Sequence, residues 1–323
     1  GWNDLVVALR NFDRVLTYEN NHGQFELTGE FATGVSPREV AVADFDKNGA
    51  PDIAVINRVS SDVSIFTTFP GRASFGKLDG VYKTDGDVAG LQVKDLNGDD
   101  YDDVVQLHRA GGDVSIRFGK ANGKLEAPVY YSMGRLPSAL EIRDINGDGK
   151  EDLITSQFSR RGGINARLGA GDGTFGPEIS SELPGGDGGR LFALIPTDLD
   201  GDGTMDIIAG YFDCRVAFFK GEGDGRFTHT YTTRFTYESR AMVTGDFDKD
   251  GDIDVAGAGY AGNVVVLENE GDLLTSGDPK RYDYEFWESG KIWKREIRST
   301  HVNGDGDLDH INGSGRGIAV LFW

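Results

Sequence analysis

The residues of this sequence whose types and spacing could do chemistry are aspartates at alternate positions of short loops. The full pattern, D-x-[DN]-x-[DN]-G-x-x-D before an apolar run, occurs at 44–52, 144–152, 198–206 and 246–254. A fifth copy, at 95–103, has Asp100 in place of the glycine, and a sixth, at 301–309, begins with His301 in place of the first aspartate. Side-chain oxygens spaced in this way, with a backbone carbonyl, form the oxygen cage that Ca²⁺ prefers, so the sequence predicts calcium-binding loops.

The predicted metal ligands are the first, third, fifth and ninth residues of each loop. We expect about five structural Ca²⁺ ions, because crowded carboxylates without a cation would repel one another strongly. The loop His301–Asp309 is a doubtful sixth site, since imidazole is a poor ligand for this hard cation. The assigned ligands are Asp44, Asp46, Asn48, Asp52, Asp95, Asn97, Asp99, Asp103, Asp144, Asn146, Asp148, Asp152, Asp198, Asp200, Asp202, Asp206, Asp246, Asp248, Asp250 and Asp254.

The loops recur in phase along the chain. Their closing aspartates follow one another at intervals of 48 to 55 residues, from Asp52 to Asp309. Asp4, which precedes an apolar run and lies 48 residues before Asp52, matches the end of a seventh, truncated copy. Self-similarity at such a period indicates a repeat architecture.

Each repeat contains four short strands. An apolar run at 40–43 leads into the acidic loop, a second run at 53–56 leaves it, a third follows at 63–66, and a Gly-x-[Phe/Leu] hairpin starts a fourth. Four strands in about 50 residues are typical of a β-propeller blade, and helical periodicity is absent. We therefore predict an all-β fold, a single β-propeller domain over 1–323 with seven four-stranded blades.

The terminal blades are expected to be incomplete. The N-terminal repeat lacks its first strand, and the C-terminal repeat stops after its third, at Phe322 and Trp323. A six-bladed ring with a composite closing blade is the alternative. In either case the acidic loops lie between the first and second strands.

The loops and their flanking strands resemble the FG-GAP or VCBS-type calcium-binding repeat of integrin alpha-subunit propellers and of secreted fungal and bacterial propeller lectins. The resemblance covers almost the whole chain. It implies that the first strand of each blade is innermost and that the acidic loops lie on the lower face. Calcium affinity in the millimolar range, typical of extracellular modules, leads us to expect a secreted or cell-surface protein.

The net charge of −20 argues against nucleic acid and an anionic membrane surface as partners. No apolar stretch of 18 residues is present, so we expect no membrane insertion.

The ends of the second strands, and the connections into the innermost ones, should lie on the opposite, upper face. They are basic and aromatic, which suits sugars, acidic glycans or an acidic protein loop, although solvated turn residues would look the same. The candidate ligand-binding residues are Arg38, Arg58, His108, Arg109, Arg190, Tyr211, Tyr237, Arg240 and Tyr260.

We predict a carbohydrate- or glycoconjugate-binding module, lectin-like or adhesive, whose partner is a glycan or glycoprotein and could be anionic. The alternative is a polysaccharide lyase acting on uronate-containing glycans, in which an upper-face arginine neutralises the uronate and His108 or a tyrosine moves protons. A purely structural role is the third hypothesis. The sequence assigns no catalytic residue, and fold alone does not decide among these functions.

Overall fold

The computed structural model describes residues 4–70, 75–159, 162–183, 190–213, 215–234, 241–258, 263–271, 280–285, 294–300, 309–314 and 317–321. Within these residues every regular element is a β-strand. No helix there is long and apolar enough to cross a membrane. The predicted all-β class is confirmed.

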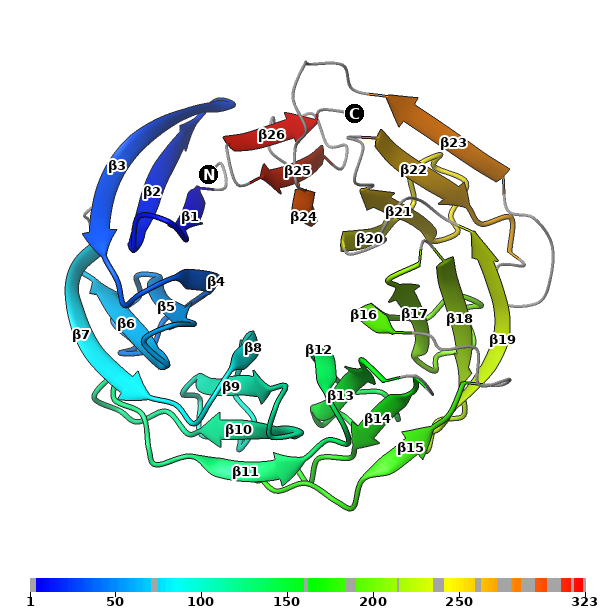
Figure 1. The fold of residues 1–323 in the computed structure, drawn as a ribbon, viewed down its shortest axis with the longest axis horizontal. Helices are drawn as coiled ribbons and strands as arrows, with labels where there is room; N and C mark the ends of the chain where they lie inside the picture. Colours follow the sequence, from blue (N-terminus) through cyan, green and yellow to red (C-terminus); the bar gives the residue numbers. More distant parts are fainter. Residues whose placement is uncertain are drawn as a thin grey trace. The chain divides into compact units, whose positions relative to one another are not determined.

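The strands form consecutive antiparallel sheets, and within each sheet the order of the strands in space follows their order in the chain (Figure 1). The first sheet consists of β1 (Leu5–Leu9), β2 (Arg14–Asn21) and β3 (Gln24–Ala32), the second of β4 (Pro37–Ala43), β5 (Asp52–Asn57), β6 (Asp62–Thr68) and β7 (Phe75–Lys83), and the third of β8 (Val88–Lys94), β9 (Asp103–His108), β10 (Asp113–Arg117) and β11 (Val129–Ser132). The fourth consists of β12 (Pro137–Arg143), β13 (Asp152–Gln157), β14 (Ile164–Arg167) and β15 (Ile179–Ser181), and the fifth of β16 (Leu191–Thr197), β17 (Asp206–Tyr211), β18 (Arg215–Gly221) and β19 (Phe227–Arg234). The sixth consists of β20 (Ala241–Gly245), β21 (Asp254–Ala258), β22 (Asn263–Glu268) and β23 (Lys280–Glu285), and the last of β24 (Lys294–Thr300), β25 (Asp309–Ser314) and β26 (Gly317–Leu321).

The described residues thus form seven sheets, of which the first and last have three strands. This agrees with seven propeller blades that are incomplete at both ends. The chain divides into two compact units, one of residues 1–142 with 169–175 and one of 143–168 with 176–323. The assignment of 1–323 to a single domain stays a prediction.

Strand register places the acidic loops where the sequence predicts them. Ala43 pairs with Asp52 at the base of the first loop, and Lys94 pairs with Asp103 at the base of the next. The same pairing of a first-strand residue with the closing aspartate recurs between β16 and β17 and between β20 and β21. Each loop therefore joins the first strand of a sheet to the second.

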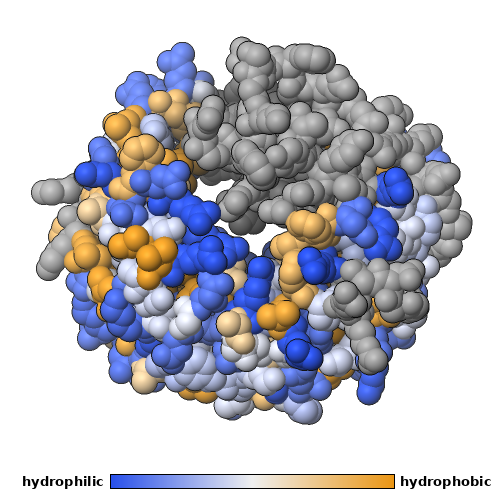
Figure 2. All heavy atoms as spheres, viewed as in Figure 1, coloured by the Kyte–Doolittle hydropathy of each residue, from blue (hydrophilic) through white to orange (hydrophobic). Residues whose placement is uncertain are grey.

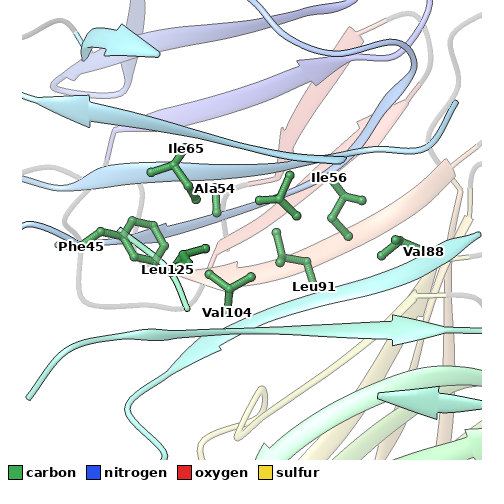
Figure 3. Close-up of a cluster of buried hydrophobic side chains, with 9 residues drawn as sticks. Phe45, Ala54, Ile56, Ile65, Val88, Leu91, Val104 and Leu125 are labelled. Atoms are coloured by element: carbon green, nitrogen blue, oxygen red, sulfur yellow. The ribbon is translucent and has the colours of Figure 1, made fainter. Parts of the chain in front are cut away.

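Both faces of a central sheet are buried. Ile53 and Val55 of β5 pack with Val15 of the first sheet, whereas Ala54 and Ile56 face the third sheet (Figure 3). All six residues of β5 are buried, so the alternation of a half-exposed strand is lost. Stacking of neighbouring sheets supplies the core, at about 1.5–3 kcal/mol for each large apolar side chain.

The hairpins after the third strands contact the preceding sheet. Leu125, which follows β10, is part of the core cluster that contains Phe45 and Ile65 of the second sheet (Figure 3). Gly173 donates its N–H to the carbonyl of Leu96 at 3.0 Å. The prediction that these hairpins start the fourth strand holds for β3 and β19 but not for β11 and β15, which begin later.

Candidate functional site

The first aspartate of each acidic loop folds the loop around its own carboxylate. Asp44 accepts the N–H of Asn48 at 3.0 Å and that of Gly49 at 2.9 Å. A bond from the sixth to the first loop residue recurs in the four other loops that the structure describes. The sixth residue needs a left-handed backbone, with φ of 85° at Gly49 and 67° at Asp100. The expectation that Asp100 adopts the glycine geometry is confirmed.

The closing aspartate, which is also an assigned metal ligand, accepts hydrogen bonds from two different segments. Asp103 is fully buried, and its two oxygens accept the N–H of Leu96 at 2.9 Å and that of Gly119 at 2.8 Å. Leu96 lies in the acidic loop, whereas Gly119 follows the third strand. Asp52, Asp206 and Asp254 are buried in the same way, each with one bond into its loop and one to the third strand or its end. The closing carboxylate therefore ties the loop to its sheet.

Burial changes the acidity of these carboxyls. Desolvation raises the pKa of Asp52 and of Asp103 to about 6, against the lowering effect of their backbone hydrogen bonds. It also raises the pKa of Asp206 and of Asp254. A nearby cation would favour the charged form of all four.

We expect the free energy of unfolding of the metal-free protein to fall as pH rises from about 4 to about 6. In this window folded Asp52 and Asp103 hold protons that an unfolded aspartate, with a pKa of 3.8, has lost. Stability therefore decreases with pH, and this contribution is lost as pH rises through the folded pKa of about 6. Because Ca²⁺ competes with protons for these carboxylates, its stabilising effect should grow over the same window. Urea unfolding in chelator measures the trend, and a rise in stability would contradict it.

Three loops bring carboxylates close enough to share a cation. In the described part of the chain, the groups whose ligand oxygens lie within 4.8 Å of one another are Asp44, Asp46 and Asp52; Asp198, Asp200 and Asp206; and Asp246, Asp248 and Asp250. The loops at 95–103 and 144–152 have asparagine at the third position and form no such group there. The loop at 301–309 lies outside the described residues.

The donor set fits a hard divalent cation. All its atoms are oxygens, and Asp198 Oδ1 is buried without any hydrogen-bond partner, while Asp198 Oδ2 accepts the N–H of Gly203. A buried carboxylate oxygen with no partner is costly, and a cation would satisfy it. These loops are acidic clusters that could bind a metal.

Three of the predicted upper-face arginines come together. Arg58 donates through Nε to Asp87 Oδ1 at 2.8 Å. That bond lowers the pKa of Asp87, and the charges of Arg58, Arg38 and Arg109 lower it further. Burial and the charge of Arg38 lower the pKa of Arg109. We call Arg38, Arg58, Arg109 and Asp87 the arginine cluster.

The strands explain this convergence. Arg58 and Arg109 directly follow β5 and β9, whereas the acidic loops end where these strands begin. Arg38 is the extra residue of a β-bulge, since its neighbours Pro37 and Glu39 pair with Asn57 and Ile56. A bulge redirects a side chain away from the regular pleat. The cluster and the acidic loops therefore occupy opposite ends of the same strands, as predicted.

Of the other described candidates, His108 and Tyr211 are buried, whereas Arg190 is exposed. His108 is 2% exposed and lies 2.7 Å from Ser115 Oγ, and burial lowers its pKa. Tyr211 is 4% exposed beneath the guanidinium of Arg215. Arg190 stacks on Phe158. Tyr237, Arg240 and Tyr260 lie outside the described residues.

The sequence reasoning did not identify Asp87 or Lys220. Asp87 lies in the connection between β7 and β8, where an acidic residue resembles a solvated turn. Lys220 lies at the end of β18 and contacts Asp200 and Asp202. The sequence feature that could have identified Lys220 is its spacing, 14 residues after the closing Asp206.

The chain is similar to several known proteins. Phosphatidylinositol-glycan-specific phospholipase D of Rattus norvegicus is 26% identical over 253 residues, which are 74% of this chain and 26% of that protein, so the chain spans about a quarter of its length. A functionally unknown protein from Desulfotomaculum acetoxidans has a TM-score of 0.63 at 13% identity, covering 99% of both chains. BBS1N in complex with ARL6DN has a TM-score of 0.63 at 12% identity, covering 99% of this chain and 86% of that one.

A family description, FG-GAP-like repeat, matches residues 1–55, 95–155, 144–209 and 198–257. These matches contain all five complete acidic loops and most of the strands that flank them, although β8 lies outside the matched ranges. They also cover more than half of the sequence. With its repeated four-stranded sheets, the chain is a β-propeller module and belongs to the FG-GAP-like repeat family.

Proposed function

We propose that this chain is a calcium-stabilised propeller module that works outside the cell and binds a glycan or glycoprotein through its arginine cluster. The observation that carries the binding proposal is the convergence of three arginines from separate segments on Asp87. Arg58 Nε donates to the Asp87 carboxylate at 2.8 Å, and the backbone N–H of Arg109 donates to the Asp87 carbonyl at 3.4 Å. Arg38 is near enough for its charge to lower the pKa of Asp87. Such a concentration of guanidinium groups stands out in a chain of net charge −20. It favours an anionic group on the ligand.

Guanidinium chemistry suits acidic sugars. Planar guanidinium forks form paired hydrogen bonds with carboxylate or sulfate oxygens. Asp87 occupies the Nε of Arg58 and orients its side chain, leaving the cluster net positive even when the nearby Glu39 is counted. The name of the rat relative refers to phosphatidylinositol-glycan, which agrees with a glycan ligand.

The described surface seen in Figure 2 favours a polar ligand. On the face shown in Figure 2, hydrophobic residues of the described part lie in small separate groups among hydrophilic ones. A contiguous apolar patch would instead indicate an apolar protein partner. We therefore place the glycan proposal ahead of an apolar docking role.

Calcium is proposed as the ion of the acidic loops. The oxygen donors, the close carboxylates and the buried Asp198 Oδ1 support a divalent cation. Ca²⁺ takes six to eight oxygen ligands, which carboxylates together with waters and backbone carbonyls can supply. A metal that prefers nitrogen or sulfur suits this donor set less well. The ion would hold the loops closed, and the protein would position the carboxylates around it.

The lyase alternative has weaker support. A proton-transfer group must reach the substrate. His108 and Tyr211 are buried, and Tyr130, which donates to Asp85 at 2.6 Å, has its pKa raised by burial to about 12. None of these three is suited to act as a base at the cluster near neutral pH. Ultraviolet absorbance of unsaturated product, after incubation with polyuronates, tests this alternative.

Replacing Arg58 or Arg109 with alanine should weaken binding of uronate or sulfated oligosaccharides about 10- to 100-fold, since a charge-assisted hydrogen bond contributes about 1.5–3 kcal/mol. A glycan array identifies the ligand, and calorimetry measures the affinity. Arg226→Ala is the matched control, because Arg226 is exposed and pairs with its neighbour Asp224. If Arg226→Ala loses binding while both cluster variants retain it, the site lies elsewhere.

A further inference from the structure

Lys220 lies on carboxylates that are expected to bind metal. Its Nζ contacts Asp200 Oδ2, and it lies 2.8 Å from Asp202 Oδ2. These are the third and fifth residues of the loop at 198–206. Among the described loops, the ion pairs place one lysine against two assigned ligands in this loop. In the others, Lys150 pairs with one ligand, Asp148, and Lys47 pairs with Asp102, which is not an assigned ligand.

The backbone fixes the direction of this lysine. Gly221 donates its N–H to Asp206 Oδ1 at 2.9 Å, and a Cβ added at Gly221 would lie 2.1 Å from the carbonyl oxygen of Met205. The end of β18 is therefore held tightly against the loop. Phe219 is fully buried, so strand alternation directs Lys220 to the other side, where the carboxylates lie.

The residue at the position of Lys220 differs from sheet to sheet. This position directly precedes the residue whose N–H donates to the closing aspartate. In the fourth sheet it directly precedes Gly169, which forms an isolated β-bridge with Phe175 as Gly119 does with Leu125. Within the described sheets that have a complete acidic loop, lysine occurs there once. The five residues at this position are Thr67, Phe118, Leu168, Lys220 and Glu268.

We infer that Lys220 is a built-in counter-cation of the loop at 198–206, which holds Asp200 and Asp202 when no metal is bound and which Ca²⁺ must displace. The inference rests on the proposed calcium binding. A single ammonium group neutralises only part of the loop, and Asp198 Oδ1 remains buried and unpaired beside it. The loop therefore still binds Ca²⁺, but more weakly than its four carboxylates would suggest.

The inference predicts different affinities for two loops that ligand counting makes equal. Loops 198–206 and 246–254 have aspartate at the same four ligand positions, and the charges of the additional Lys249 and Asp252 in the second loop offset one another, so counting predicts equal affinity. The residue at the lysine position is Glu268 in the second of these, which adds no positive charge. We expect loop 198–206 to fill last of the two as Ca²⁺ is raised, and to keep its order best in chelator.

Calorimetric titration of metal-free protein with Ca²⁺ tests the inference. Lys220→Met keeps the length of the side chain and removes its charge, and should lower the dissociation constant of loop 198–206 about tenfold, as expected for loss of two exposed ion pairs. Adding Asp198→Ala to the wild type and to the variant identifies the heat that belongs to this loop. Lys220→Arg, which keeps the charge, should bind Ca²⁺ as the wild type does.

The reciprocal variant is Thr67→Lys, which places a lysine at the matching position beside loop 44–52 and should weaken that loop by a similar factor. If Lys220→Met does not fold, the Ca²⁺ affinity of Thr67→Lys tests the inference instead. In chelator, Lys220→Met should melt below the wild type, because the carboxylates lose their counter-cation. Unchanged affinities in both variants overturn the inference while leaving the calcium proposal intact. If the wild type binds no Ca²⁺ at all, the calcium proposal fails and the inference falls with it.

Discussion

Transfer of the protein from millimolar Ca²⁺ into excess chelator should lower its melting temperature by about 10 °C or more. The carboxylates of three loops lie within 4.8 Å of one another, so each loop is strained by repulsion when its ion is removed. At millimolar affinity, Ca²⁺ can exceed its dissociation constant about tenfold, which stabilises the native state by about 1.4 kcal/mol per ion and by about 7 kcal/mol for five ions. Each kcal/mol corresponds to about 2–4 °C in a domain of this size class. Tryptophan fluorescence during a thermal scan measures the shift.

A control separates specific binding from screening. The net charge of −20 means that any salt reduces self-repulsion and raises stability to some extent. Readdition of Ca²⁺ should restore the melting temperature, whereas NaCl of matched ionic strength should not. If the melting temperature stays the same in chelator, with metal content verified as nil, the acidic loops are not structural calcium sites.

The spacing of the aspartates was sufficient to predict the repeat, the strand class and the position of the loops. These features are local. The turn at Gly49 or Asp100, and the strand that leaves the loop at Asp52 or Asp103, are each determined by residues within a few positions. The sequence therefore predicts them without knowledge of any partner strand.

The second role of the closing aspartate is not local. Asp103 accepts a hydrogen bond from Gly119, 16 residues away, and only the antiparallel pairing of β9 with β10 makes that bond possible. Spacing within the loop assigns the residue a metal-binding role alone. Its complete burial likewise depends on contacts outside the loop, which the loop sequence does not reveal.

Residues at the ends of strands show a similar limit. Polar and aromatic residues such as His108 and Tyr211 are typical of exposed turns, so the sequence favours the surface for them. Stacked sheets bury both faces of these strands, and His108 pairs with Ser115 inside. By contrast, Arg58 and Arg109 lie one residue further along, past the last strand residue, and converge on Asp87. One position along the chain separates the core from the candidate ligand site.

The closing aspartate gives the second large effect. Replacing Asp103 with alanine should lower the free energy of unfolding by about 2–4 kcal/mol even in chelator. The N–H groups of Leu96 and Gly119 would lose their acceptors in a buried site, at about 1–3 kcal/mol each. Recovery of the desolvation cost of the carboxylate, which raises its pKa to about 6, offsets part of this loss. Urea unfolding of the wild type and the variant in chelator measures the difference.

Asp99→Ala in the same loop is the matched control, because Asp99 is exposed and bonds within its loop to Tyr101 and Asn97. In chelator this variant should differ from the wild type by no more than about 0.5 kcal/mol, as is usual for surface substitutions. In Ca²⁺ it should lose part of the stabilisation by the ion, because a charged ligand is gone. Asp103→Ala should be destabilised in both conditions. If the two variants behave alike in chelator, the closing carboxylate contributes only as a ligand, and its hydrogen bonds to the loop and to the end of the third strand do not hold the sheet together.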